Sequence, residues 1–413
     1  GGGKGIQVVE QADEFHALFQ RVTVEARAAF GNGDVYLEKY VTALRHIEVQ
    51  LLRDTHGNTK VLGLRDCSVQ RDKQKVFEES DSTMLPDHLR EDVFRHTAAL
   101  ADKVSYVGAG TVEFIYDVAN DAVYFMEMNT RLQVEHPVTE WVSGIDIVSE
   151  QFRIASGESI ADLEPQKNGY AIEARVNAER IQADGSGKLS FRPHPGQVTI
   201  CNFPEEEGVE VIATVSDGKF VSPFYDSMVA QVIVHAEDRP SAVAKLTGYL
   251  DRIDIQGIST NIPLLKRVLG DDVFNKGVYD TGYLPDFLAR TDSEALIAEI
   301  DASAGEVRGG IDLNAIRIED SDELKVLSPA TAIFYTTPTP TEPEYVTVGD
   351  RIKVTDTIGQ LVAMKLFTPL KLADFNNEAT LYDPDREYEV TRINMATGQQ
   401  VTQGDLLLVV KPV

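Results

Sequence analysis

The chain has 413 residues, of which 43% are hydrophobic and 25% charged, as in an ordinary globular protein of two to four domains. Its net charge of −27 repels phosphates, so we expect neither nucleic acid nor a membrane surface as a partner. We predict a cytoplasmic protein, because the two cysteines are isolated and the sequence shows neither an apolar run long enough to span a membrane nor a leader pattern at its start.

The chain begins with GGGKG, a composition typical of loops whose backbone N–H groups surround a phosphate. A Walker-type loop is excluded, because a preceding strand and the ending GK[ST] are both missing from this stretch. Lys4 and Gly5 are therefore candidates for contacting the phosphates of a nucleotide.

Strand and helix patterns alternate from Gly1 to about Leu288 and predict a mixed α/β region. Within it, TVEFIYD and AVYFMEMN predict two strands joined by a turn at Asn120 and Asp121. Because side chains alternate along a strand, Glu113 is expected nearly opposite Glu127.

Two carboxylates in such positions repel each other unless a cation neutralises them. Mg²⁺ or Mn²⁺ binds oxygen ligands of this kind, so Glu113, Glu127 and Asn129 are predicted metal ligands. The alternative is a solvent-exposed strand edge on which both acids are simply hydrated.

Arg131, Gln133, Glu135 and His136 follow the second strand at close spacing. A guanidinium group binds a small planar anion in two places, and a neighbouring carboxylate can act as a general base. These residues predict an anion-binding catalytic site beside the metal. The alternative is that they are ordinary polar residues on the protein surface.

Residues 289–325 are acidic and predict a helix followed by an exposed connector. From Val326 onward short strand patterns are separated by turns, and TPTPTEPEY predicts a stiff protruding loop. VGDRIKVTDTIGQLV and TGQQVTQGDLLLVV form a weak internal repeat, which favours a small two-fold β-sandwich over two unrelated hairpins.

Several stretches resemble biotin carboxylases of the ATP-grasp superfamily, in the order found in that family. They comprise YLEKYVTALRHIEVQLL, RDCSVQRDKQKVFEE, GAGTVEF, EMNTRLQVEHPVTE, EARVNAE, FYDSMVAQVIV and IQGISTNIPLL. The last zone resembles a biotin carboxyl carrier domain, because VAMKL is similar to the biotin attachment motif of that family.

The resemblance implies an α/β (α+β) ATP-grasp body with a partial lid, followed by a small all-β sandwich of the biotinyl/lipoyl type. It implies a lid remnant at residues 1–41, a carboxylase body at 42–288, a linker at 289–325 and a carrier at 326–413. The N-terminal region of biotin carboxylases has no counterpart in this sequence, and we therefore expect the chain alone to bind ATP weakly.

The resemblance also implies a reaction, in which ATP activates bicarbonate to carboxyphosphate and the resulting CO₂ is attacked by a ureido nitrogen of biotin. The implied catalytic residues are Glu135 as the base for bicarbonate, Arg131 and Lys75 as its cationic contacts, and Arg175 for the biotin enolate. The bicarbonate site is completed by Gln133 and the Val134 backbone, and the metal ions are bound by Glu113, Glu127 and Asn129. The implied nucleotide contacts are Lys4, Gly5, Glu38, Lys39, His46, Gln70 and Ile115. Covalent biotin is attached to Lys365. For His46, a purely packed histidine is the alternative.

The function implied is that of an ATP-dependent ligase, the biotin carboxylase component of an acetyl-CoA or related acyl-CoA carboxylase. Its expected partners are bicarbonate, ATP, a carboxyltransferase, a biotin protein ligase and a second copy of the carboxylase body. Two alternatives remain open: a catalytically impaired carrier or scaffold that needs a complementing N-terminal half, and another ATP-grasp ligase joining a carboxylate to an amine.

Overall fold

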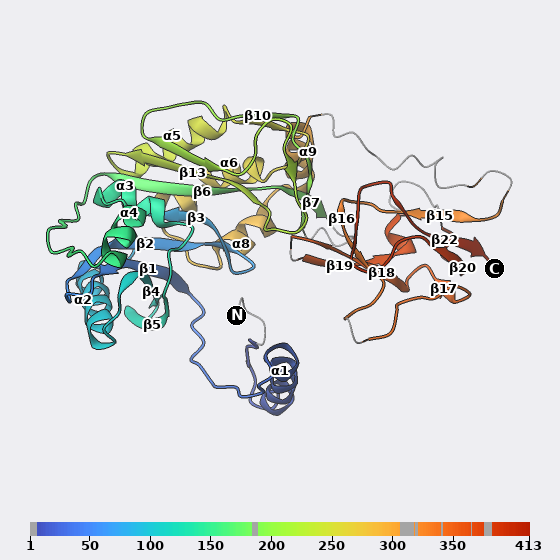
Figure 1. Cartoon of the computed structure of the whole chain (residues 1–413), viewed down its shortest axis with the longest axis horizontal. Helices are drawn as coiled ribbons and strands as arrows, with labels where there is room; N and C mark the ends of the chain where they lie inside the picture. Colours follow the sequence, from blue (N-terminus) through green and yellow to red (C-terminus); the bar gives the residue numbers. More distant parts are fainter. Residues whose placement is uncertain are drawn as a thin grey trace. The chain divides into compact units, whose positions relative to one another are not determined.

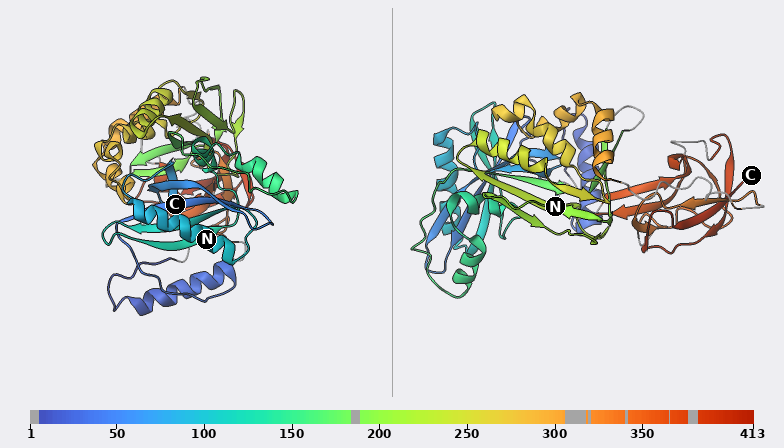
Figure 2. Two further views of the ribbon diagram at one scale, coloured as in Figure 1. Left: turned by 90° about the vertical axis from the view of Figure 1, so that its left-hand side faces the viewer. Right: turned by 90° about the horizontal axis from the view of Figure 1, so that it is seen from above.

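The computed structural model describes residues 6–183, 189–305, 318, 321–339, 342–364, 366–375 and 382–413, so Lys4, Gly5 and Lys365 lie outside the described residues. The chain forms two units, each built from separate stretches of sequence. Figure 1 labels the elements along the chain, and Figure 2 shows them from two further directions. Unit 1 comprises Gly1–Ala174, Ile233–Ala244 and Asp271–Phe287, and unit 2 comprises Arg175–Val232, Lys245–Gly270 and Leu288–Val413. The four segments predicted above stay predictions.

Unit 1 contains six neighbouring strands of an eight-stranded sheet, in the order β6-β3-β2-β1-β4-β5, and every neighbouring pair among these six is antiparallel. The elements of this region are α1 (Phe15–Phe30), β1 (Leu44–Arg53), β2 (Thr59–Arg71), β3 (Gln74–Glu79), α2 (Asp87–Lys103), β4 (Gly108–Asp117), β5 (Ala122–Asn129), α3 (His136–Ser143), α4 (Ile147–Ala155), β6 (Tyr170–Asn177), β13 (Met228–Ala236), α5 (Arg239–Leu250), α7 (Asp272–Lys276) and α8 (Tyr283–Arg290). The predicted mixed α/β architecture is confirmed.

The two faces of this sheet have different chemistry. On one face Ile47, Val49 and Leu51 of β1 pack with Val93 of α2 in a fully apolar core. On the other face α4 covers one end of β1, where Leu52 packs in a smaller apolar cluster. His46, Glu48 and Gln50 alternate with the α2-facing residues, so β1 presents a row of polar side chains on the face opposite α2.

The part of unit 1 before β1 contains one helix and no strand among its described residues. Residues 6–10 and 32–41 flank α1 without regular structure, and the side chains of Tyr36 and Leu37 are 80% and 74% exposed. This region is where a partial lid was predicted.

A buried ion cluster holds the three stretches of unit 1 together. Arg239 donates to both oxygens of Glu79, with an Nε–Oε2 distance of 2.6 Å, and to the backbone oxygens of Phe274 and Asn275. Tyr279 donates its hydroxyl to the same carboxylate, and Tyr170 does so at 2.6 Å. Glu79 therefore joins β3 to both later stretches of the unit.

Unit 2 contains short paired strands and two helices before its C-terminal part. They are β7 (Glu179–Ala183) with β8 (Leu189–Pro193), β9 (Gly196–Gln197) with β12 (Phe220–Val221), β10 (Ile200–Asn202) with β14 (Asp254–Gln256), then β11 (Val209–Ala213), α6 (Ile262–Leu269) and α9 (Ser293–Ser303). The helix predicted in the acidic stretch is α9.

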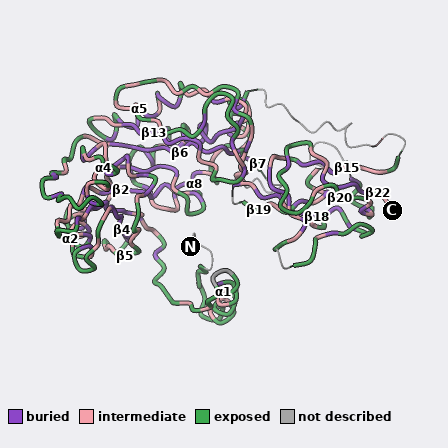
Figure 3. Tube along the Cα trace, in the orientation of Figure 1, coloured by how far each residue is buried: buried purple, intermediate pink, exposed green. Residues whose placement is uncertain are grey.

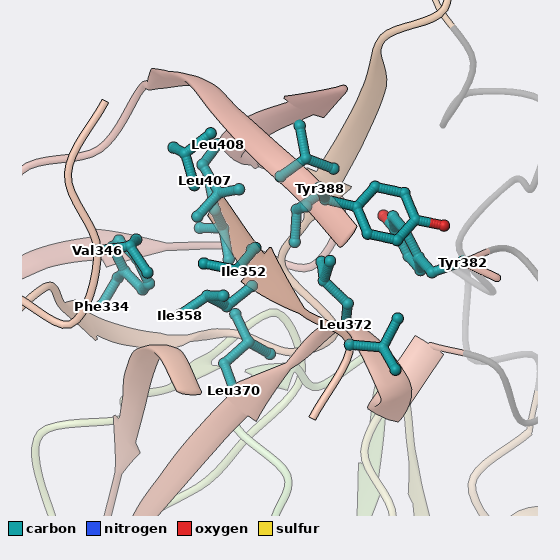
Figure 4. Packing of buried hydrophobic residues seen from close by; sticks show 14 of the residues in the cluster. Phe334, Val346, Ile352, Ile358, Leu370, Leu372, Tyr382, Tyr388, Leu407 and Leu408 are labelled. Carbon is teal, nitrogen blue, oxygen red and sulfur yellow. The ribbon is translucent and has the colours of Figure 1, made fainter. Parts of the chain in front are cut away.

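The C-terminal part consists of two four-stranded sheets, ordered β15-β22-β20-β17 and β19-β18-β16-β21. The strands are β15 (Leu324–Leu327), β16 (Ala332–Tyr335), β17 (Arg351–Lys353), β18 (Thr357–Ala363), β19 (Leu366–Lys371), β20 (Glu387–Ile393), β21 (Gln399–Val401) and β22 (Leu406–Pro412), with a short 3₁₀ turn at Leu372–Phe375. Both sheets contribute to one core, in which Phe334, Ile358 and Leu408 are buried (Figure 4).

Buried positions follow the central strands of each part, and the connections between strands are largely exposed (Figure 3). Among the residues that the structure describes, no helix has both the length and the apolar character needed to cross a membrane.

The Glu79 cluster yields a stability prediction. Changing Tyr279→Phe removes a hydrogen bond to a buried carboxylate and should lower the free energy of unfolding by about 1.5 to 3 kcal/mol. Tyr106→Phe is the matched control, because that hydroxyl donates to the neutral backbone oxygen of Ala109 at 2.7 Å and should cost only about 1 kcal/mol. Urea denaturation measures both variants, and an equal loss in the two would contradict a special role for Glu79.

Candidate active site

The hairpin of β4 and β5 carries the predicted metal ligands. Glu113 pairs directly with Glu127, and Thr111 pairs with Asn129, as the alternation of the two strands predicted. A β-bulge between Glu113 and Phe114 adds Met126 to β5, a local irregularity that the sequence pattern did not indicate. The carboxylates therefore face each other across the ladder.

Neighbouring amides bridge these two like charges. The side-chain nitrogen of Asn129 lies 2.6 Å from Glu113 Oε1 and 3.5 Å from Glu127 Oε1. Gln133 donates to the same Glu113 oxygen at 2.8 Å. Two carboxylates and an amide are hard oxygen ligands, so these residues fit a divalent cation of the Mg²⁺ type.

Glu48 lies beside this pair, on β1 between β2 and β4. Its register partners are Arg65 on β2 and Glu113 on β4, and its side chain is completely buried. Arg65 contacts Glu48 Oε2 at 3.2 Å and 3.1 Å through Nε and Nη2, and the amine of Lys75 binds the other oxygen.

Lys75 connects this buried charge to the predicted base. Its amine is hydrogen-bonded to Glu135 as well as to Glu48, so one cation lies between two carboxylates. Glu135 is also buried and immediately precedes α3. The structure thus brings Lys75 and Glu135 together with the metal hairpin.

Burial and charge act in opposite directions on these groups. Burial alone would raise the pKa of Glu48, but Lys75, His46 and Arg65 hold it well below its ordinary value. Burial alone would lower the pKa of Lys75, but the neighbouring carboxylates Glu48 and Glu135 raise it above the ordinary value. Both groups are therefore charged at neutral pH.

His46 points at the carboxylates from the neighbouring position on β1. Its Nε2 lies 3.1 Å from Glu113 Oε2 and 3.3 Å from Glu48 Oε1, although neither contact is aligned as a hydrogen bond. The Gln70 amide nitrogen lies 2.9 Å from the other ring nitrogen, and the Ser68 hydroxyl accepts from the His46 backbone N–H at 3.0 Å. Both the ring and the backbone of His46 therefore have polar partners.

The remaining predicted residues are less tightly held or lie elsewhere. Arg131 is exposed and donates to the Leu132 backbone and the Asn129 side chain, while Val134 is 39% exposed. Ile115 is the register partner of His46, and Lys39 lies 5.0 Å from the Tyr124 ring centroid. Glu38 is exposed in the stretch before β1. Arg175 lies on β6 in unit 2, so its role stays a prediction.

Sequence reasoning missed Glu48 and Arg65, which occupy the centre of the cluster. A charged residue inside an otherwise apolar strand, as in HIEVQLL and VLGLRDC, was the available signal. Cys67 is completely buried beside this cluster, and burial raises the pKa of its thiol.

The chain is similar in sequence to several known proteins. Residues 1–163 match the family model of the carbamoyl-phosphate synthase L chain ATP-binding domain, and residues 173–286 match the biotin carboxylase C-terminal domain. Biotin carboxylase 1 of Bacillus subtilis is 43% identical over 286 residues, and a pyruvate carboxylase component of Methanothermobacter thermautotrophicus is 39% identical over 296. The alignments cover 69% and 71% of this chain, but 62% and 59% of these relatives.

Solved structures show the same similarity. A biotin carboxylase complex with β,γ-ATP from Campylobacter jejuni has a TM-score of 0.65 at 39% identity, covering 69% of this chain and 63% of that one. The biotin carboxylase domain dimer of Hydrogenobacter thermophilus 2-oxoglutarate carboxylase, solved with MgADP, ADP and bicarbonate, has a TM-score of 0.64 at 40% identity, covering 69% and 62%.

His46 provides a pH-dependent prediction. Burial alone would lower its pKa, but contacts with Glu113 and Glu48 raise the pKa of His46 to about 9. Because an unfolded histidine titrates near about 6.5, protonation of His46 stabilises the folded chain below that pH, and this contribution is lost as pH rises through about 9. An NMR titration of the metal-free protein should show the elevated value, and a lower one in Glu113→Gln.

His194 is an internal reference for that titration. Burial, together with the nearby Arg180 charge, lowers the pKa of His194 to about 4, so its signal should not move between pH 6 and 9. A His46 signal that titrates at or below the value of an unfolded histidine would contradict the assigned contacts.

Proposed function

We propose that this chain uses ATP and bicarbonate to carboxylate biotin, as part of an acetyl-CoA or related acyl-CoA carboxylase. The proposal is supported by the match of residues 1–163 to an ATP-binding domain model and of residues 173–286 to the biotin carboxylase C-terminal domain. One observation carries the proposal. Lys75 joins Glu135, the predicted base, to buried Glu48, immediately beside the Glu113–Glu127 pair.

Each part of the cluster supports one part of this reaction. Glu135 takes the proton of the bicarbonate hydroxyl, and Lys75 and the Gln133 amide offer N–H donors to the anion. Arg131 supplies a guanidinium fork for the same small planar anion. Glu113, Glu127 and Asn129 hold the metal ion, which when bound neutralises the charge of the ATP phosphates.

The nucleotide occupies the open side of the hairpin in this proposal. His46, Gln70 and Ile115 line the strands next to the metal ligands, and Glu38 and Lys39 precede them on the chain. Lys4 and Gly5 contact the phosphates. Arg175 stabilises the biotin enolate, a role that suits a cation unable to lose its proton.

The C-terminal part is proposed to carry the biotin. In the hairpin of β18 and β19, Ala363 pairs with Leu366, and the two residues between them in the sequence are Met364 and the predicted biotinyl residue Lys365. Two sheets with a shared core and the motif VAMKL support a biotin carboxyl carrier domain, modified by a biotin protein ligase.

The acyl acceptor is the most specific part of the proposal. Relatives include pyruvate and 2-oxoglutarate carboxylases, so the choice of acyl-CoA rests on the carrier-like sequence and the TPTPTEPEY loop. A carboxyltransferase is then the acceptor-binding partner. Since the Hydrogenobacter thermophilus domain is a dimer, we propose a second copy of the carboxylase body as a further partner.

A second candidate is favoured by the region before β1. Residues 6–10 and 32–41 form no strands around α1, so an incomplete lid would weaken ATP binding. In that case the chain acts as a carrier or scaffold that requires a complementing polypeptide.

Bicarbonate-dependent ATP cleavage by the full chain distinguishes the two candidates. Glu135→Gln should reduce the rate by about 100-fold to 10,000-fold, the contribution of a general base, while MgATP binding measured by calorimetry stays unchanged. Glu150→Gln on α4, whose carboxylate pairs with Arg153, should leave the rate unaltered. Absence of any bicarbonate-dependent cleavage by the unaltered chain would favour the scaffold.

Mass spectrometry after coexpression with a biotin protein ligase tests the carrier assignment. We expect one biotinyl group on the unaltered chain and none on Lys365→Arg. Lys371→Arg, at the end of β19, is the control and should be biotinylated normally. Biotinylation that persists in Lys365→Arg would place the group on another lysine.

A further inference from the structure

We propose that Arg65 is a positioning residue for the bicarbonate site, and that it acts by turning the N–H side of the Gln133 amide toward the anion. This inference rests on the proposed function, because bicarbonate is the ligand whose binding it explains. Arg65 lies at the centre of the active-site cluster, has no exposed surface and was not among the residues that the sequence indicated.

The Arg65 guanidinium connects separate parts of unit 1. Nη1 donates to Gln50 Oε1 at 2.9 Å and to Thr139 Oγ1 at 2.8 Å, while Nη2 donates to Gln133 Oε1 at 3.0 Å. Nε and Nη2 both contact Glu48. One side chain on β2 therefore joins β1, α3 and the segment between β5 and α3.

Gln133 can face the anion with either its carbonyl oxygen or its amide nitrogen. Bicarbonate needs N–H donors, and a carbonyl oxygen turned toward it would be repulsive. Because Arg65 is a donor without any acceptor atom, it pairs with the Gln133 oxygen and leaves the nitrogen on the opposite side. That nitrogen points to Glu113, toward the metal hairpin.

The same contacts fix the segment that carries the predicted base. Residues 130–135 form no helix or strand, so hydrogen bonds must hold them in place. Arg65 holds Gln133 before Glu135 and Thr139 after it, through separate nitrogens. Glu135 is thereby restrained on both sides at the position where it meets Lys75.

A lysine at position 65 would retain the charge that Glu48 requires, but it lacks the planar fork. Its ammonium group has three donors on one atom and cannot reach acceptors on opposite sides. Arg65→Lys therefore separates the positioning role from the need to neutralise a buried carboxylate.

The experiment compares Arg65→Lys with Arg239→Lys in the full chain. Arg239 is also buried and also pairs with a carboxylate, Glu79, but contacts the backbone of residues 274 and 275 instead of the Gln133 segment. We expect Arg65→Lys to raise the KM for bicarbonate about tenfold, the effect of losing one charge-assisted hydrogen bond, with the KM for ATP unchanged. Arg239→Lys should lower the urea midpoint and change neither KM.

A double-variant cycle tests whether Arg65 acts through Gln133. Gln133→Met should raise the KM for bicarbonate, and adding Arg65→Lys should raise it little further, because the amide to be oriented is already absent. Fully additive effects, an equal rise in both KM values, or the same split in Arg239→Lys would each overturn the proposal.

Hydrogen exchange separates failure of this inference from failure of the proposed function. If the unaltered chain cleaves no ATP with bicarbonate, the function fails, but the amides of residues 130–136 still report on Arg65. Faster exchange there in Arg65→Lys, and not in Arg239→Lys, supports the positioning role. Unchanged exchange in Arg65→Lys overturns it.

Discussion

Glu48 carries a negative charge with no solvent exposure, and the arrangement of the site follows from the need to compensate that charge. An unpaired carboxylate in such a place costs several kcal/mol of folding free energy, so cations must accompany it. Arg65 on β2 and Lys75 on β3 meet this need, one at each oxygen. Each cation has further N–H donors, which bind Gln133 and Glu135. The two groups that compensate the buried charge therefore also position the predicted bicarbonate contact and the predicted base.

The pairing of the strands makes this cluster possible. Because β1 lies between β2 and β4, Glu48 has Arg65 on one side and Glu113 on the other. The residues that alternate with it form the apolar core against α2. A register shift of one residue would exchange the two faces and bury the charges in that core, so the core and the site specify the same register.

The sequence was most informative where the determinants are local. Alternation along two adjacent strands was enough to place Glu113 opposite Glu127. The bulge at Met126 and the roles of Glu48 and Arg65 depend on contacts between residues distant in sequence. Gln50, Thr111 and Thr139 contact Arg65 from positions 15, 46 and 74 residues away, and no local pattern encodes such distances.

The discontinuity of unit 1 bears on how the chain folds during its synthesis. The β3 residue Glu79 leaves the ribosome long before Arg239 and Tyr279, the two groups that compensate its charge from the later stretches. Until they are made, the carboxylate must stay hydrated, which keeps the surroundings of Glu79 open to water. Unit 1 therefore completes its packing only after both intervening stretches of unit 2, Arg175–Val232 and Lys245–Gly270, have been translated.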